Sequence, residues 1–315
     1  MIGFIARRLA TAVIVVIGIS VLMFGLLHVI YPSPALDLLG ARTPTVVINA
    51  WNREHGYDDP WIVQYLHYMG NLLHGNLGYS YKQNQPVLDI FAQRWAPSAW
   101  LSGISVVFAV LIAIPVGVYQ AAKRNTVGDY AVTSVAFVLY AMPVFFLGLI
   151  LIQIFSLDLN WFNFEGSQSG NVLAIMGDWH SMTLPVASLT LISVAQFSRY
   201  MRSQSIDVLA QDYIKVARAK GLPERLVLGR HLLRNASLPL VTLIGLSIPA
   251  LLAGNILTEQ LFNYHGLGTA FTAALSNQDY NVLLAYTLIG AVLTVIGNLI
   301  ADVALTVADP RIRLS

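Results

Sequence analysis

Six long apolar runs dominate the chain. None of them contains Asp, Glu, Lys or Arg, and they cover residues 9–36, 95–122, 130–157, 179–198, 235–258 and 280–301. A helix needs roughly 20 mostly apolar residues to cross a bilayer, so each run predicts one membrane-spanning helix. The predicted fold class is therefore all-α, a polytopic membrane protein with six transmembrane helices.

Two further uncharged runs, residues 60–81 and 260–278, are too polar to be spans. The first contains His67, His74 and several asparagines and glycines. It nevertheless predicts a helix near residues 60–74, which Asp58-Asp59-Pro60 starts with Asp as the cap and Pro60 in the first turn. This helix lies on the membrane surface or against the spans. The apolar positions that share one side of this helix at helical spacing are Trp61, Ile62, Tyr65, Met69, Leu72 and Leu73.

The second to fifth predicted spans each contain one proline, at Pro115, Pro143, Pro185 and Pro249. Proline is tolerated in membrane helices because neighbouring groups satisfy the carbonyls that it frees. Two interpretations stay open from the sequence, which are kinked packing and hinge points for a pathway that opens and closes.

Composition supports the membrane interpretation. Hydrophobic residues make up 56% of the chain and charged residues 11%, against about 25% charged in ordinary soluble domains. The absence of cysteine excludes disulfides and thiolate chemistry.

The distribution of Lys and Arg predicts the orientation, because positively charged loops stay on the cytoplasmic side. With six spans, fourteen of the eighteen basic residues fall on one side and four on the other. This places residues 1–8 and 310–315 in the cytoplasm, with a first span over 9–31. It predicts an extracytoplasmic loop over 32–94 and a five-span core over 95–309.

Ionisable and catalytic patterns are sparse in the spans. No span carries a carboxylate pair, a histidine relay or an arginine ladder, and no GxxxxGK[ST], HExxH or GxSxG pattern occurs. We therefore expect no catalytic residue and no cofactor, metal or nucleic-acid site, and an energy source in a partner. An ion-coupled secondary transporter and a non-transporting membrane scaffold remain alternatives.

Residues 211–239, here called the basic hairpin, are the densest charged segment. They contain two acids, Asp212 and Glu224, and six basic residues, Lys215, Arg218, Lys220, Arg225, Arg230 and Arg234. The segment predicts a helix over 212–220 that Gly221 ends, followed by a second helix with Pro223 in its first turn. We expect Tyr213, Val216, Ala217 and Lys220 to share one face of the first helix.

Two roles fit the basic hairpin. Anionic lipid would attract it by about 1 kcal/mol per basic residue. A docking role is favoured, because Ala217, Ala219 and Gly221 have little side-chain bulk and would let a partner protein approach the backbone.

The basic hairpin resembles the cytoplasmic coupling loop, or EAA loop, of ABC importer permeases of the dipeptide, oligopeptide and nickel family, B-type. Beyond Ala217-Arg218-Ala219-Lys220-Gly221, the similar segments are Ile5-Ala6-Arg7-Arg8-Leu9, Leu77-Gly78-Tyr79-Ser80, Gln85-Pro86-Val87, Ala141-Met142-Pro143-Val144-Phe145-Phe146-Leu147-Gly148 and Asp309-Pro310-Arg311-Ile312-Arg313. The chain departs from the family pattern at His265, where a proline is usual. It also departs in the coupling loop, where Val216-Ala217-Arg218-Ala219 stands at the place that the name EAA loop assigns to Glu-Ala-Ala.

This resemblance implies a permease subunit of an ATP-driven importer in the inner membrane of a prokaryote, with di- or oligopeptides as substrates and nickel-type relatives sharing the frame. It implies a second, C-type permease, two ABC ATPases that hold ATP and Mg, an extracytoplasmic substrate-binding protein and contact with membrane lipid. The implied ATPase-coupling residues are Asp212, Tyr213, Ala217, Arg218, Ala219, Lys220 and Gly221, within a coupling hairpin over 211–236. The outer-turn candidates are Glu259, Phe262, Gly266 and Gly268.

Overall fold

The chain is almost entirely helical. The structure, a computed structural model, describes residues 2–30, 33–40, 42–253 and 255–308, so the closing motif Asp309–Arg313 and the predicted segment 310–315 lie outside the described residues. One short ribbon interrupts the helices, in which β1 (Tyr79–Ser80) pairs antiparallel with β2 (Gln85–Pro86). The prediction of a helical, polytopic membrane protein is confirmed at this level.

Within the described residues, four single helices are long and apolar enough to cross a membrane. They are α1 (Ile2–Ile30), α5 (Val87–Ala122), α9 (Trp179–Leu209) and α16 (Tyr280–Ala308). They correspond to the first, second, fourth and sixth predicted spans. Helix α5 begins after Pro86, well before the apolar run, and therefore includes Asp89 and Arg94 in its first turns.

The third predicted span, residues 130–157, is not one continuous helix. Helix α6 (Val127–Ala141) is followed by α7 (Val144–Leu151) and the π-helix η1 (Ile152–Asp158), with a bend of 107° between the two parts. Met142 is extended, with ψ 131°, because the ring of Pro143 disfavours helical backbone at the preceding residue. Pro143 therefore breaks its helix, whereas Pro115 and Pro185 lie inside α5 and α9.

The fifth predicted span, residues 235–258, is divided among short helices. It begins in α12 (Leu233–Ala236), continues through α13 (Leu238–Ala253) and ends in α14 (Ile256–Leu261). Helix α13 has 16 residues, fewer than the roughly 20 that cross a bilayer unaided. The structure thus gives four single spans and one bent pair, and the number six stays a prediction.

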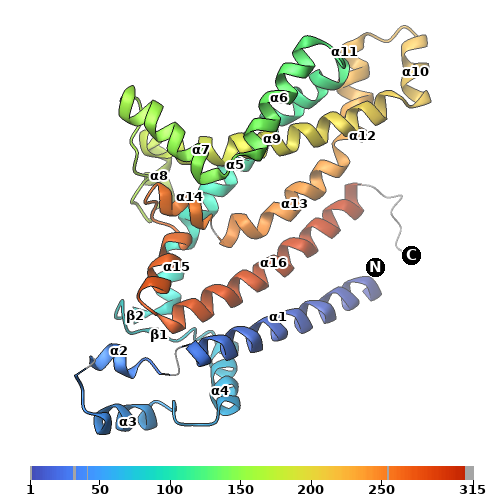
Figure 1. Cartoon of the computed structure of the whole chain (residues 1–315). Helices are drawn as coiled ribbons and strands as arrows, with labels where there is room; N and C mark the ends of the chain where they lie inside the picture. The colour runs from blue at the N-terminus through green and yellow to red at the C-terminus, as the bar shows by residue number, and fades with distance from the viewer. Residues whose placement is uncertain (1, 31–32, 41, 254, 309–315) are drawn as a thin grey trace.

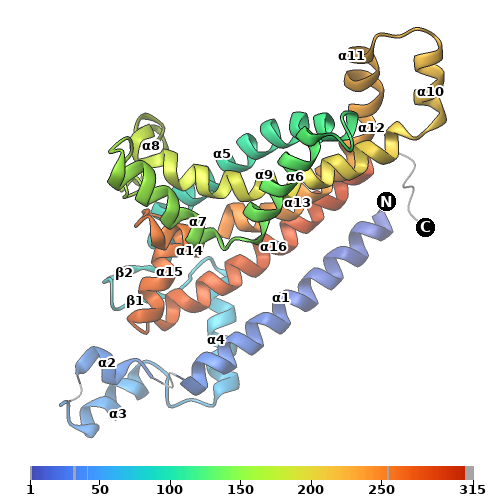
Figure 2. The same cartoon turned by 45° about the horizontal axis from the view of Figure 1, so that its top comes forward.

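The two ends of the molecule differ in content. Figures 1 and 2 both place the start of α1, the end of α16 and the helices α10 (Asp212–Ala219) and α11 (Glu224–Leu226) at one end. The opposite end holds α2 (Ala35–Leu39), α3 (Thr45–Glu54), α4 (Trp61–Leu73), the β-ribbon and α15 (Leu267–Ser276). Segments that the charge pattern assigns to opposite sides therefore lie at opposite ends.

Helix α4 occupies the place of the helix predicted near residues 60–74. Pro60 is its N-cap residue, and the cap makes no side-chain hydrogen bond. The hydroxyls of Tyr65 and Ser20 are hydrogen-bonded at 2.7 Å. The ring of Tyr65 packs edge-on against the ring of Phe24. The helix therefore lies against α1, the second of the two placements that the sequence left open.

Helices α5 and α9 form the main helix pair of the core. Residues from both helices and from the basic hairpin are buried together, and these include Ala109, Ala113, Phe197, Met201 and Leu232. In the most apolar 18 residues of each helix, 50% of the residues are buried in α9 and 17% in α1. Helix α1 is therefore the peripheral span.

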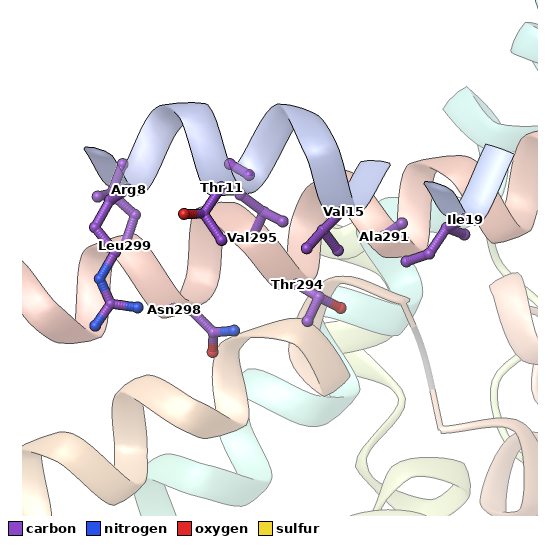
Figure 3. A pocket seen from close by; sticks show the side chains of 10 residues that line it. Arg8, Thr11, Val15, Ile19, Ala291, Thr294, Val295, Asn298 and Leu299 are labelled. Atoms are coloured by element: carbon purple, nitrogen blue, oxygen red, sulfur yellow. The ribbon is translucent and has the colours of Figure 1, made fainter. Parts of the chain in front are cut away.

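A cavity of about 230 Å³ separates part of α1 from α16. Figure 3 shows Arg8 of α1 beside Leu299 and Asn298 of α16, and Val15 of α1 beside Thr294 further along the groove. The two helices thus lie side by side, and the groove follows the line along which they meet.

Candidate functional site

The first helix of the basic hairpin ends as the sequence predicts. Gly221 has a φ of +76°, its N–H donates to the carbonyl of Arg218 at 2.9 Å, and the N–H of Leu222 donates to the carbonyl of Ala217 at 3.3 Å. This pair of bonds is the Schellman motif, which favours glycine because the backbone is left-handed. The prediction that Gly221 ends the helix is confirmed.

The second arm restarts one residue later than predicted. Pro223 is the N-cap of α11 rather than a residue of its first turn. The chain then continues through the π-helix η2 (Val227–Leu232) into α12. Together these elements bring the second arm back toward the end of α9.

A small apolar cluster holds the two arms together. Ile214, Ala217 and Val227 are buried, and Val208, Leu209 and Leu222 pack against them. Ile214 and Ala217 are three residues apart and so share one face of a helix. This face closes the hairpin on itself and on the end of α9.

Ala217 follows Tyr213 by one turn of α10, as expected, but the expectation that a partner could approach the backbone at Ala217 is wrong. Ala217 is 5% exposed, whereas Tyr213 is 43% and Val216 52% exposed. At roughly 100° per residue, Ala217 lies between Tyr213 and Ile214 around the helix, and it is buried with Ile214 and Val227 in the cluster that joins the two arms. Tyr213 and Val216 therefore form the apolar part of the surface that a partner can reach, together with the exposed residues Ala219, Lys220 and Gly221.

Ion pairs use part of the charge in the basic hairpin. Lys215 pairs with Asp212 within α10 at 2.8 Å, and Arg218 pairs with Glu224 across the turn at 2.6 Å. Hydrogen bonds from the Arg218 guanidinium hold the pKa of the Glu224 carboxyl below its usual range. Asp212 and Arg218 therefore also serve local structure, beside any contact with a partner.

The sequence reasoning missed a buried ion pair next to the basic hairpin. The carboxylate of Asp129, at the start of α6, accepts hydrogen bonds from Nε and Nη2 of Arg202 on α9, at 2.8 and 2.7 Å. The backbone N–H of Asn125 donates to the same carboxylate at 3.0 Å. The spacing of Thr126 and Asp129, typical of a helix start, could have drawn attention to this acid.

The outer-turn candidates are brought together around a buried carboxylate. Glu259 is fully buried. Its Oε1 accepts from the Ser98 hydroxyl at 2.7 Å and from the backbone N–H of Asn255 at 3.1 Å, and its Oε2 accepts from the N–H of Gly268 at 2.7 Å. Glu259 therefore ties α14 to α5 and to the start of α15.

Close approach explains both glycines of this turn. A Cβ at Gly266 would overlap the Glu259 carboxylate and the Ser98 hydroxyl, and a Cβ at Gly268 would lie 2.7 Å from the Cα of Ile256. Phe262 is fully buried as well. All four predicted outer-turn residues thus belong to one packed unit.

Two residues that the sequence reasoning did not select complete this unit. Ser98 also accepts from the N–H of Leu267 at 2.7 Å, and Tyr264, fully buried, donates to the carbonyl of Pro97 at 2.8 Å. The turn forms with His265 at the position where the resembling family has proline. Its backbone bonds include Tyr264 N–H to the Glu259 carbonyl at 2.8 Å.

Over the described ranges, no three His, Asp or Glu side chains group in a way that could hold a metal ion. The residues selected from the sequence therefore form two structural units. One is the basic hairpin at one end of the molecule, and the other is the turn around Glu259 at the opposite end.

Apolar spans that carry a projecting polar hairpin at one end define an integral membrane protein. Comparison with known proteins makes this class specific. The family model described as binding-protein-dependent transport system inner membrane component matches residues 113–314, and its N-terminal companion matches residues 1–102. The chain belongs to this family of transport permeases.

Relatives match over their whole length. The oligopeptide transport system permease protein AppB of Bacillus subtilis is 37% identical, with 99% of this chain and all of the relative covered. The dipeptide transport system permease protein DppB of Escherichia coli is also 37% identical, with 99% of each chain covered. The glutathione transport system permease protein GsiC of Escherichia coli is 34% identical, again over 99% of each chain.

Proposed function

We propose that the chain forms part of the translocation pathway of an ATP-driven importer of short peptides. Support for the substrate class comes from the relatives, which are named for oligopeptides, dipeptides and the tripeptide-like compound glutathione and align from end to end. That this chain itself transports short peptides is part of the proposal.

The proposed complex contains a second permease of the C-type, two ABC ATPases and an extracytoplasmic substrate-binding protein. ATP and Mg are bound by the ATPases, and this chain supplies no catalytic residue. In the proposed arrangement the chain crosses a prokaryotic inner membrane six times. Both termini and the basic hairpin lie on the cytoplasmic side, and the long loop lies outside. The excess of Lys and Arg at one end supports this orientation.

One observation carries the coupling role of the basic hairpin. Its two arms pack on each other through Ile214, Ala217 and Val227, while Tyr213 and Val216 point away with about half of each side chain exposed. An apolar pair on a polar, self-supported projection is typical of a docking surface. We assign this surface to the ATPase contact.

The hairpin can transmit force because it is continuous with the core. Helix α9 runs directly into α10, and the returning arm packs with α5 and α9 through Leu232 and Ala236. Closure of the ATPases on ATP would move this unit and, with it, the inner ends of the spans. The substrate-binding protein would deliver peptide at the opposite end.

Reconstitution with candidate partners tests the proposal. Proteoliposomes that contain both permeases, the ATPases and the binding protein should take up radiolabelled dialanine only with Mg-ATP on the ATPase side. An ion-coupled secondary transporter would instead work alone with a proton or sodium gradient. A scaffold would show no flux with any combination, and either outcome would contradict the proposal.

A further inference from the structure

The outer turn borders a second feature, a polar cavity of about 350 Å³. It lies between the start of α5, the end of α14, the start of α15 and the loop that precedes α8. The side chains that give it its chemistry are Arg94, Gln168, Gln260, Asn263, His265 and Thr272. No Asp or Glu belongs to its lining.

Arg94 is half-buried in this wall, and none of the described carboxylates pairs with it directly. Its Nη1 donates to the hydroxyl of Thr269 at a long 3.4 Å. Across the described chain, no carboxylate lies within ion-pair distance of Arg94. A partly desolvated cation is costly unless an anion compensates it.

The nearby carboxylates are engaged elsewhere. Glu259 already accepts hydrogen bonds on both oxygens from Ser98, Asn255 and Gly268. Glu165, on the loop, accepts a long bond of 3.5 Å from Asn263. Glu259 attracts the Arg94 guanidinium through space, but neither acid accepts a hydrogen bond from it, so N–H groups of Arg94 are left for a ligand.

The remaining lining groups suit amide ligands. Gln260 and Asn263 carry side-chain amides, each able to donate and to accept. The Oε1 of Gln260 accepts from the Thr272 hydroxyl at 2.6 Å, which fixes the orientation of this amide and directs its NH₂ group away from Thr272. A guanidinium beside side-chain amides in one cavity matches a carboxylate followed by a peptide bond.

We propose that this cavity binds the C-terminal carboxylate of a short peptide, with Arg94 holding the carboxylate and the amides of Gln260 and Asn263 binding the adjoining peptide group. Arginine pairs with carboxylates through two parallel hydrogen bonds. The volume lies at the small end of ligand pockets, which hold about 300–1,000 Å³, and suits the last one or two residues. This inference rests on the proposed peptide importer and names a site within it.

Direct binding to the importer tests the site. The complete transporter in lipid nanodiscs, without its substrate-binding protein, would be titrated by equilibrium dialysis with radiolabelled dialanine and with dialanine amide. The wild-type protein should bind the acid about 10- to 100-fold more tightly than the amide, the range expected for a hydrogen-bonded ion. Arg94→Met should bring acid binding down to the level of the amide, and Arg94→Lys should fall between.

A matched control removes an exposed arginine outside α5, in the segment between α2 and α3. Arg42 is exposed, and Arg42→Met makes the same chemical change away from the cavity, so it should leave acid binding unchanged. Equal binding of acid and amide by the wild-type protein, or no binding of either, would overturn the site. The comparison of acid with amide uses the wild-type protein alone, so it tests the site even if Arg94→Met fails to assemble.

The outcomes also separate the site from the proposed function. If ATP-driven dialanine uptake occurs with the binding protein but Arg94→Met binds acid like the wild type, only the site fails. If Arg94→Met weakens docking of the peptide-free binding protein and leaves peptide binding intact, Arg94 serves protein docking and the site is again overturned. Absence of peptide uptake by the full complex would contradict the proposed function itself.

Discussion

Arg218 and Glu224 close the basic hairpin by a two-bond ion pair across its turn. Nη2 of Arg218 donates to Oε1 of Glu224 at 2.6 Å, and Nε donates to Oε2 at 3.2 Å. The pair joins the last turn of α10 to the first residue of α11, so it fixes the angle between the two arms. The proposed docking residues Tyr213 and Val216 lie on the exposed side of α10.

The pair makes the hairpin sensitive to acid. Because Arg218 lowers the pKa of Glu224, its stabilisation is present above the unfolded-state pKa and is lost as pH falls through the lowered pKa. Glu224→Gln should reduce hydrogen-exchange protection of the Val227 amide by about 1.5- to 5-fold at pH 7, as expected for an exposed pair. Below the lowered pKa, wild type and variant should exchange alike.

Asp212→Asn is the control for that experiment, because Asp212 pairs with Lys215 inside α10 and does not join the arms. It should leave protection at Val227 unchanged. An equal effect of both variants would show that charge in general, and not the bridge between the arms, stabilises the hairpin.

Gly221 should tolerate very few replacements. Its φ of +76° costs an ordinary L-residue about 1–2 kcal/mol, so Gly221→Leu should destabilise the turn by that amount, while Gly221→Asn should cost less. Hydrogen exchange at Leu222, whose N–H closes the turn, measures the effect. Gly229→Leu is the matched control, since open space surrounds Gly229 and its φ is not positive. Equal loss of protection in both leucine variants would contradict the conformational argument.

The turn around Glu259 should reject added bulk. Gly266→Ala places a methyl group against Glu259 and Ser98, and overpacking of this kind costs about 1–3 kcal/mol. The midpoint of SDS-induced unfolding in mixed micelles should fall accordingly. Gly103→Ala, in α5 with nothing within 4 Å of the added atom, should be neutral or slightly stabilising. Similar midpoints for both variants would refute the tight packing of the turn.

The buried pair between Asp129 and Arg202 should matter more than other charges on α9. Arg202→Met leaves a fully buried carboxylate without its counter-ion, and breaking such a pair costs about 3–5 kcal/mol. Arg199→Met on the same helix removes only a cation–π contact with Tyr140 at 4.8 Å, worth about 0.5–1 kcal/mol. The same unfolding assay compares them, and a smaller loss for Arg202→Met would contradict the assignment.

The apolar runs predicted where most helices lie, because burial in lipid requires long uncharged segments with internally bonded backbone. They could not predict the break at Met142-Pro143, since a membrane helix can keep an internal proline, as Pro115 and Pro185 do in α5 and α9. They also overextended the fifth span, where the chain divides into α13 and α14. Whether proline bends or breaks a helix depends on the packing around it.

The hairpin and the outer turn show what local signals can predict. Gly221 was predictable because a helix end needs a left-handed residue. The burial of Ala217 was predictable in principle from the spacing of Ile214, Ala217 and Leu222, but small size drew attention to its exposure instead. The contacts of Ser98 and Arg94 with the outer turn join residues more than 150 positions apart, and no pattern within one sequence segment encodes such pairs.

The most direct test of the account measures ATP-driven dialanine uptake by reconstituted complexes that carry Val216→Asp. Val216 is 52% exposed on the proposed docking face, so a carboxylate there should leave the hairpin folded. Burial of that charge against an apolar partner surface should weaken the contact, because removing a charge from water costs free energy. Val127→Asp, at an even more exposed valine at the start of α6, is the matched control. The account predicts that Val216→Asp lowers uptake and ATPase co-purification by about 10-fold or more, as for a hot-spot residue, while Val127→Asp retains both. Normal uptake by Val216→Asp complexes would contradict the coupling role of the basic hairpin.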